Sequence, residues 1–102
     1  EDAHTQWQRD KPFVLDVRPT DQYDEVHVPG AINMPLAELG ENSQALNILP
    51  RDLDAPILSI CQRGNASLSG LLVLKSLGYR NVRSVDGGTL AWRDKGFVTD
   101  SE

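Results

Sequence analysis

Residues 57–67, with the sequence ILSICQRGNAS, decide the fold. The first four form a short apolar run that is typical of a buried strand, and Cys61 stands at its carboxyl end. A small polar loop containing Gly64 and Asn65 follows, and Ser67 opens a leucine-rich helix. A strand, a short loop and a helix in this order form one unit of a parallel sheet. The stretch therefore indicates an α/β protein.

The same alternation of strands and helices extends on both sides of this unit. Strands are expected at residues 13–16, 31–34, 57–60 and 81–85, and helices at 3–9, 20–26, 36–46, 67–77 and 89–95. Thr20 fits the N-cap of the second helix. Leucines on almost every side of residues 67–77 predict that this helix is the most buried one. We expect a three-layer α/β/α fold around a central parallel sheet of four to five strands, the fifth lying upstream of Glu1.

The length and composition favour one soluble globular domain. The chain has 102 residues, of which 39% are hydrophobic, and this is enough to build a core without disulfides. We expect a single domain over residues 1–102, with an ordered core of about 12–97 and flanking segments at 1–11 and 98–102. The chain starts with Glu1 and lacks a leader pattern, so we expect a fragment of a longer or processed protein. We expect a monomer.

Charge and cysteine content argue against several functions. Ten basic and fifteen acidic side chains give a net charge of −5, which argues against nucleic-acid binding. The longest apolar run, residues 71–74, is too short to cross a membrane. A single cysteine cannot form an internal disulfide or a thiolate zinc cluster. His4, His27 and Cys61 have no metal-ligand spacing, so we expect neither a metal nor a cofactor.

Cys61 is the candidate catalytic residue. It ends a strand, where open α/β sheets bind their ligands, and its loop leads into a helix N-terminus with unpaired N–H groups. These dipoles favour an anion and lower the pKa of a thiol, and Arg63 adds a positive charge. Gly64 lets the loop curl. We expect a thiolate nucleophile that needs no general base; the alternative is a small, buried structural cysteine.

Other polar residues favour structural interpretations. Asp16 and Arg18 follow the first strand, where they either shape the pocket rim or form a structural ion pair, and we favour the ion pair. His27 is expected to be a hydrogen-bonded structural residue, because a thiolate needs no proton acceptor. His4 is expected to be solvated.

Four motifs follow one another along the chain: residues 15–18 (LDVR), 23–31 (YDEVHVPGA), 61–67 (CQRGNAS) and 87–92 (GGTLAW), the last followed by Gly96 and Phe97. Together, over about residues 13–97, they resemble the rhodanese (sulfurtransferase) family. The resemblance implies a central five-stranded parallel sheet between helices. It also implies an enzyme in which Cys61 takes a sulfane sulfur from a donor such as thiosulfate and holds it as a persulfide. The residues that would bind the substrate are Gln62, Arg63, Gly64, Asn65, Ala66 and Ser67.

The resemblance also bears on partners and location. The single cysteine means that an outside nucleophile, such as cyanide, a thiol or a protein, must collect the sulfur. The segment from Gly64 to Ser67 is similar to rhodanese domains fused to adenylating enzymes of sulfur-carrier pathways. Gln62 stands where the family frequently has a basic residue, which leaves Arg63 as the loop's cation, and the net charge opposes steering of a dianionic donor. An exposed thiolate favours a reducing compartment, so we expect the cytoplasm.

Two alternative functions are open. The first is a catalytically idle rhodanese-like module that only binds a partner protein. The second is a cysteine-dependent phosphatase or arsenate reductase of similar fold. Such enzymes need an arginine six residues after the cysteine to clamp the oxyanion. That position holds Ser67 here, and Arg63 comes too early, which argues against the second alternative.

Overall fold

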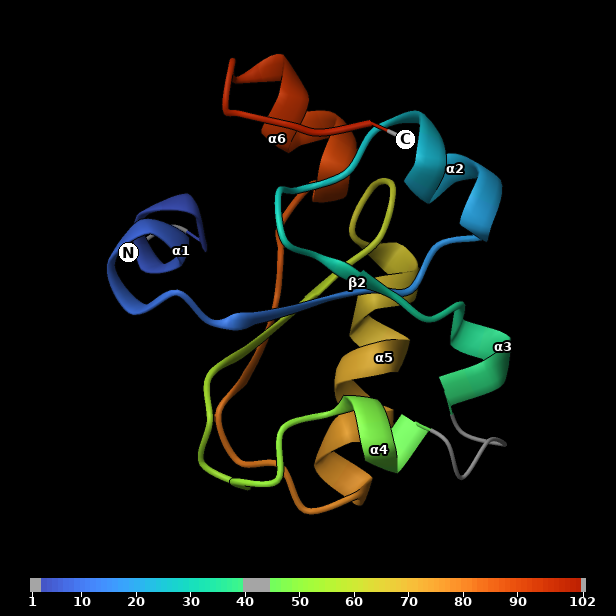
Figure 1. The fold of residues 1–102 in the computed structure, drawn as a ribbon, viewed down its shortest axis with the longest axis vertical. Helices are drawn as coiled ribbons and strands as arrows, with labels where there is room; N and C mark the ends of the chain where they lie inside the picture. Colours follow the sequence, from blue (N-terminus) through green and yellow to red (C-terminus); the bar gives the residue numbers. More distant parts are fainter. Residues whose placement is uncertain (1–2, 40–44, 102) are drawn as a thin grey trace.

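The computed structural model describes residues 3–39 and 45–101 (Figure 1). The helices are α1 (Ala3–Asp10), α2 (Thr20–Glu25), α3 (Leu36–Leu39), α4 (Ala45–Ile48), α5 (Asn65–Ser76) and α6 (Gly88–Asp94). The strands are β1 (Phe13–Asp16), β2 (Ile32–Asn33), β3 (Ile57–Ile60) and β4 (Val82–Ser84).

The four strands form one parallel sheet in the order β2-β1-β3-β4. The predicted α/β fold with a central parallel sheet is therefore confirmed, and a fifth strand upstream stays a prediction. From β1 the chain first moves outward to β2 and then returns past β1 to β3. The carboxyl ends of β1 and β3 are thus the point where the strand order reverses, and such points are where open sheets bind ligands.

Alternation along the strands divides the core into two clusters, one on each face of the sheet. Leu15 and Ile57 belong to the first cluster, together with Leu74 from α5 and the partly buried Leu36 from α3. The second cluster lies against α1, α2 and α6. Its buried residues are Ala3, Val14, Val28, Ala31, Leu58, Ile60, Val85 and Trp92. Figure 1 shows α3, α4 and α5 grouped away from α1, so helices cover both faces.

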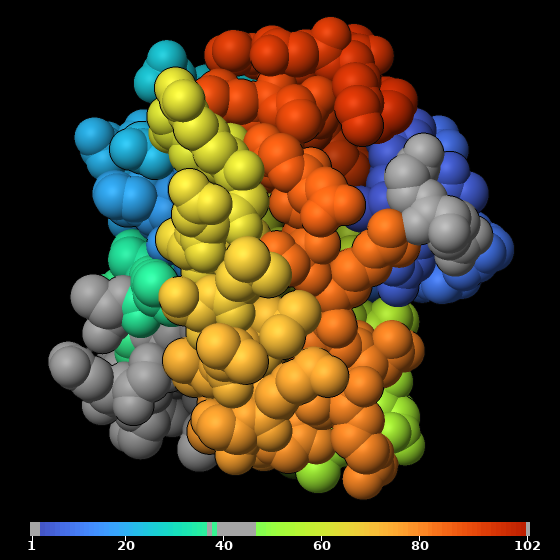
Figure 2. Space-filling model, turned by 180° about the vertical axis from the view of Figure 1, so that it is seen from behind, coloured from blue at the N-terminus to red at the C-terminus, as the bar shows by residue number. Residues whose placement is uncertain are grey.

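The prediction that the 67–77 helix is the most buried one is wrong. Helix α5 starts at Asn65 and buries Ser67, Gly70 and Leu74, so mostly small residues face the sheet. Leu68 and Leu72 lie on its outer side and are 55% and 66% exposed. Figure 2 shows α5 open on this surface of the molecule, in yellow and gold. Ser67 and Gly70 fit where α5 lies close to the sheet, and Leu74 is the leucine of α5 that reaches the core. Leu68 and Leu72 point outward.

Two further helices differ from the sequence prediction. Pro19 is the N-cap of α2, and the Thr20 hydroxyl instead donates to Asn33 Oδ1 at 2.9 Å. Residues 36–46 do not form one described helix: α3 and α4 are separate four-residue helices, and residues 40–44 of that prediction lie outside the described part of the chain.

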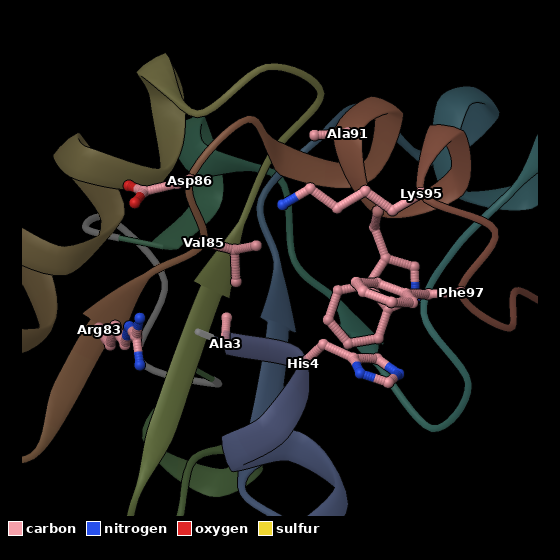
Figure 3. Close-up of a pocket in the computed structure, with 9 residues that line it drawn as sticks. Ala3, His4, Arg83, Val85, Asp86, Ala91, Lys95 and Phe97 are labelled. Carbon is pink, nitrogen blue, oxygen red and sulfur yellow. The ribbon is translucent and has the colours of Figure 1, made fainter. Parts of the chain in front are cut away.

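His4 is packed among aromatic rings, so the expectation that it is solvated is wrong. Its ring stacks on Phe97 with centroids 3.6 Å apart and meets Trp92 edge-on at 5.1 Å. Figure 3 shows this cluster forming one wall of a pocket between α1 and α6.

Ala3 and Trp7 of α1 also pack on the second core cluster. Helix α1 therefore covers this face of the sheet. The assignment of residues 1–102 to one domain stays a prediction.

A helix needs about 20 mostly apolar residues to cross a bilayer. Within residues 3–39 and 45–101, no helix is both long enough and apolar enough to cross a membrane.

We predict that Leu74→Ala and Leu72→Ala will have very different effects on stability, although both are on α5. Leu74 is fully buried, so its truncation should lower the free energy of unfolding by about 2–5 kcal/mol. Leu72 is mostly exposed, so its truncation should change that free energy by no more than about 0.5 kcal/mol. Urea denaturation measures both values. Equal losses in the two variants would contradict the described orientation of α5.

Candidate active site

A pocket of about 260 Å³ opens at the carboxyl ends of β1 and β3. Its lining comes from the segment after β1, from α2, and from the loop between β3 and α5 with the first turn of α5. The lining residues are Val17, Arg18, Pro19, Gln22, Cys61, Gln62, Arg63, Asn65 and Ala66. The pocket is therefore at the reversal of strand order, where the sheet topology places a ligand site.

Cys61 lines this pocket, although the residue is only 3% exposed. Burial by itself raises the pKa of the Cys61 thiol, because charge is less stable away from water. Hydrogen bonds from the Ser67 hydroxyl and from the main-chain N–H groups of Ser67, Gly64 and Arg63 outweigh burial and lower the pKa below its ordinary value. The Gly64 N–H lies 2.9 Å from Cys61 Sγ. The loop thus favours the thiolate.

The loop keeps this shape because two glycines allow close packing behind it. Gly64 has φ of 102° and is the N-cap of α5, a conformation that side chains rarely adopt. Gly88 begins α6, and a Cβ there would lie 2.2 Å from the Cys61 carbonyl oxygen. The Thr89 N–H donates to that oxygen at 2.8 Å, and the Leu90 N–H donates to the Gln62 carbonyl at 3.1 Å. The first turn of α6 therefore fixes the loop from behind.

Three serines lie on the inner side of the loop. Ser59 and Cys61 point to the same face of β3, because side chains two residues apart share a face. The Ser59 hydroxyl donates to the Ser67 carbonyl at 3.0 Å. The Ser67 hydroxyl is 3.5 Å from Cys61 Sγ, 3.1 Å from the Gly64 carbonyl oxygen and 2.6 Å from the Ser84 hydroxyl. Ser67 is thus the polar contact between the thiol and β4.

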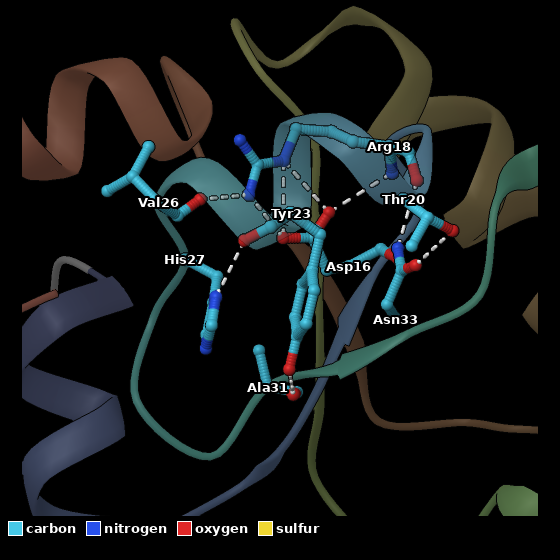
Figure 4. A network of polar contacts seen from close by, with 8 residues as sticks. All are labelled: Asp16, Arg18, Thr20, Tyr23, Val26, His27, Ala31 and Asn33. Atoms are coloured by element: carbon cyan, nitrogen blue, oxygen red, sulfur yellow. Dashed lines mark hydrogen bonds and ion pairs between the residues drawn. The ribbon is translucent and has the colours of Figure 1, made fainter. Parts of the chain in front are cut away.

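Asp16 and Arg18 form the ion pair that the sequence analysis favoured. The Arg18 guanidinium donates to both carboxylate oxygens of Asp16, with the shortest distance 2.7 Å, and also to the Val26 carbonyl (Figure 4). Both side chains are almost completely buried. Asn33 holds the same turn by donating to the main-chain carbonyls of Asp16 and Arg18. The pair therefore anchors the segment that supplies one wall of the pocket.

His27 lies outside the pocket lining and has structural contacts. Its Nδ1 is 2.7 Å from the Tyr23 carbonyl oxygen, and its ring stacks on the Tyr23 ring at 3.9 Å (Figure 4). Its main chain pairs with Asp100 in both directions. These contacts agree with the interpretation of His27 as a hydrogen-bonded structural residue.

The structure brings together most of the residues proposed from the sequence. Arg18, Gln62, Arg63, Asn65 and Ala66 line the pocket with Cys61. Gly64 and Ser67 contact its sulfur, whereas Asp16 and His27 do not line the pocket. The roles of these residues in binding a substrate stay predictions.

Sequence reasoning did not identify several other residues of the site. Val17, Pro19 and Gln22 line the pocket, and their position just after β1, at the expected reversal of strand order, was a usable signal. Ser84 gave no such signal, because only the side-by-side arrangement of β3 and β4 brings it near Ser67.

No group of three or more potential metal-ligating side chains was found within residues 3–39 and 45–101.

The fold and the site define a class of protein: a parallel α/β domain with a cysteine held by main-chain donors at the switch point of the sheet. The pattern of the rhodanese-like domain family matches residues 1–95, and the chain therefore belongs to this family.

Curated relatives have sulfur-transfer names. The thiosulfate sulfurtransferase GlpE of Pseudomonas entomophila is 40% identical over 80 residues, which are 78% of this chain and 69% of that protein. The adenylyltransferase and sulfurtransferase uba4 of Ogataea parapolymorpha is 38% identical over 81 residues, or 79% of this chain. This chain spans only 20% of the length of uba4.

A solved structure supports the fold. The crystal structure of a rhodanese-related protein from Thermoplasma volcanium aligns with a TM-score of 0.84 and 31% identity. The alignment covers 100% of this chain and 97% of that protein.

We predict that the Cys61 thiol reacts as a thiolate at lower pH than an ordinary thiol. The rate of alkylation by iodoacetamide should reach half its maximum below the pH of about 8.5 expected for free cysteine. Ser67→Ala should move this midpoint upward by about one unit, because it removes a donor to the charged sulfur. N-acetylcysteine is the reference thiol. A wild-type midpoint equal to that of the reference would contradict the donor arrangement.

We predict that Asp16→Asn destabilises the protein strongly, because it leaves the buried Arg18 charge without its partner. The expected loss in the free energy of unfolding is about 3–5 kcal/mol. Asp54→Asn is the matched control, since Asp54 and Arg80 form an ion pair in which both side chains are about two-thirds exposed. The control should leave stability nearly unchanged. Urea denaturation compares the variants, and a similar loss in both would show that burial does not matter here.

Proposed function

We propose that this chain is a sulfurtransferase in which Cys61 carries sulfur as a persulfide. The observation that carries the proposal is a thiol that lines a pocket and accepts a hydrogen bond from the main chain of its own loop, an arrangement that lowers its pKa. Membership of the rhodanese-like family supports it, and so do relatives named for sulfur transfer.

In the first step the Cys61 thiolate attacks the outer, sulfane sulfur of a donor such as thiosulfate. A sulfur–sulfur bond forms to Cys61 Sγ, and the bond between the sulfane sulfur and the sulfonate sulfur breaks. Sulfite leaves with the electron pair of the broken bond, and the enzyme keeps the single negative charge on the terminal sulfur of the persulfide. No proton is transferred, so no general base is required.

In the second step a nucleophile from outside the site attacks the terminal sulfur and regenerates the Cys61 thiolate. Cyanide gives thiocyanate in this reaction, and a thiolate gives a new persulfide. The chain has one cysteine, so the acceptor is a separate molecule or another part of a larger assembly. We propose a protein or small thiol as the acceptor, and a reducing compartment such as the cytoplasm, where the thiolate stays unoxidised.

Two arginines line the pocket, and they differ in how far their charge is already paired. The Arg18 guanidinium is held by Asp16 and by the Val26 carbonyl, whereas Arg63 is exposed on the pocket lining. Arg63 is therefore the cation that meets an incoming anionic donor. Because the chain has a net charge of −5, this attraction acts at short range and is opposed at long range. We propose a small anionic sulfane-sulfur donor, of which thiosulfate is the test case.

We predict that incubation with thiosulfate adds one sulfur atom to the intact mass of the wild-type protein. Cys61→Ser should gain no mass, because it lacks the nucleophile. In a cyanide assay the wild type should produce thiocyanate, and Cys61→Ser should produce none above the rate without enzyme.

A second arm of this experiment separates the alternatives. Mercaptopyruvate is tested in parallel as a different sulfur donor, and a phosphate ester as a phosphatase substrate. A wild-type protein that accepts sulfur from neither donor would contradict the proposed enzyme and favour a partner-binding module. Hydrolysis of the phosphate ester that depends on Cys61 would favour the phosphatase alternative.

A further inference from the structure

The Ser67 hydroxyl has more acceptors than it has protons. Its single O–H can point to the Gly64 carbonyl oxygen at 3.1 Å or to Cys61 Sγ at 3.5 Å. While the sulfur is a neutral thiol, its own proton can point at Ser67, and the Ser67 proton then serves the Gly64 carbonyl. Once the sulfur is a thiolate it can only accept, so Ser67 stabilises it only if the hydroxyl proton turns toward Sγ.

Ser84, on β4, is placed to decide this choice. Its hydroxyl is 2.6 Å from Ser67 Oγ, and within residues 3–39 and 45–101 this is the one hydrogen bond of that hydroxyl. Ser84 does not line the pocket of Cys61. Ser67 Oγ has lone pairs to accept a proton, whereas the Ser67 proton is required by the sulfur. The arrangement that gives the most of these polar atoms a hydrogen bond has the Ser84 hydroxyl donating to Ser67 Oγ. The Ser67 hydroxyl then donates its own proton to the sulfur of Cys61.

We propose that Ser84 is a positioning residue that donates its proton to Ser67 Oγ and thereby directs the Ser67 proton onto the sulfur of Cys61. We call this chain of hydrogen bonds from Ser84 through Ser67 to Cys61 the relay. Its purpose rests on the proposed function, since the relay stabilises a thiolate or a persulfide. A chain of hydroxyls oriented in one direction is polarised along its length, so the last donor in the chain bonds more strongly to an anion.

The charged groups around the sulfur do not obscure this effect. The charged side chains that line the pocket within the described residues are Arg18 and Arg63. Arginine keeps its charge throughout the accessible pH range. Asp16 from β1 is paired with Arg18. A change in the titration between variants at position 84 therefore reports on the thiol.

The experiment compares Ser84→Thr with Ser84→Val in the full chain. The two side chains have similar shape, and both suit a strand, so they differ mainly in the hydroxyl that the relay needs. The alkylation rate with iodoacetamide is measured as a function of pH. Ser84→Thr should keep the wild-type midpoint, and Ser84→Val should raise it by about half a unit. Below the midpoint the Val variant should be alkylated about threefold more slowly, and the rates should converge at high pH.

Ser59→Ala is the matched control. Ser59 is buried and, like the partly buried Ser84, it contacts Ser67, but it donates to the main-chain carbonyl and not to the hydroxyl. This variant should lower the melting temperature without moving the alkylation midpoint. A shift in Ser59→Ala as large as that in Ser84→Val would show that general loosening explains the effect, and would overturn the proposal.

Two other results would also overturn it. Equal midpoints in the Thr and Val variants would show that the Ser84 hydroxyl has no effect on the thiol. A lower midpoint in the Val variant would show that Ser84 accepts the Ser67 proton and competes with the sulfur.

The alkylation measurement needs no sulfur donor, so it separates this inference from the proposed function. A wild-type protein that takes no sulfur from any donor, while the Thr and Val variants differ as expected, would contradict the sulfurtransferase proposal and support the relay.

Discussion

Burial and hydrogen bonding act on Cys61 in opposite directions, and the donors of its own loop decide the result. A sulfur this far from water would stay protonated if it were surrounded only by apolar groups. Main-chain N–H groups from Arg63, Gly64 and Ser67 and the Ser67 hydroxyl instead stabilise its negative charge. Because these groups are already oriented by the loop, no solvent has to reorganise when the thiolate forms.

This arrangement imposes a requirement on the sheet and on α5. The loop can surround the sulfur only if α5 starts close to the end of β3, and the helix then lies near the sheet. Ser67 and Gly70 satisfy that requirement with small side chains, and Ser59 satisfies a carbonyl beneath the helix. The leucines of α5 that have no room inside, Leu68 and Leu72, lie on the outer surface. The exposed apolar surface of the helix is thus a consequence of the geometry that the thiolate requires.

The sequence was sufficient to predict the fold class and the place of Cys61 at the carboxyl end of a strand, because both follow from local patterns. The apolar run at residues 57–60, the glycine in the loop and the helix after it are adjacent in the chain, and their order predicts a strand-loop-helix unit. The Asp16–Arg18 pair was predictable for the same reason, since its members are two residues apart and follow a strand.

Properties that depend on packing between distant elements were not predictable in this way. The composition of the 67–77 helix predicts deep burial, but the distance to the sheet decides which of its residues fit inside. His4 was assigned to solvent because nothing near it in the chain indicates the stacking with Phe97. Ser84 reaches Ser67 only because β4 lies beside β3, and Gly88 reaches the Cys61 carbonyl only because α6 starts there. A pattern within one segment carries no information about such contacts.

The contact between α6 and the loop has a consequence for the order in which the site forms during synthesis. The amides of Thr89 and Leu90 fix the carbonyls of Cys61 and Gln62 from a position late in the chain. A ribosome-bound chain that has not yet released these residues contains Cys61 but lacks the segment that fixes its loop from behind. The loop around Cys61 is therefore fully supported only after α6 has emerged and docked.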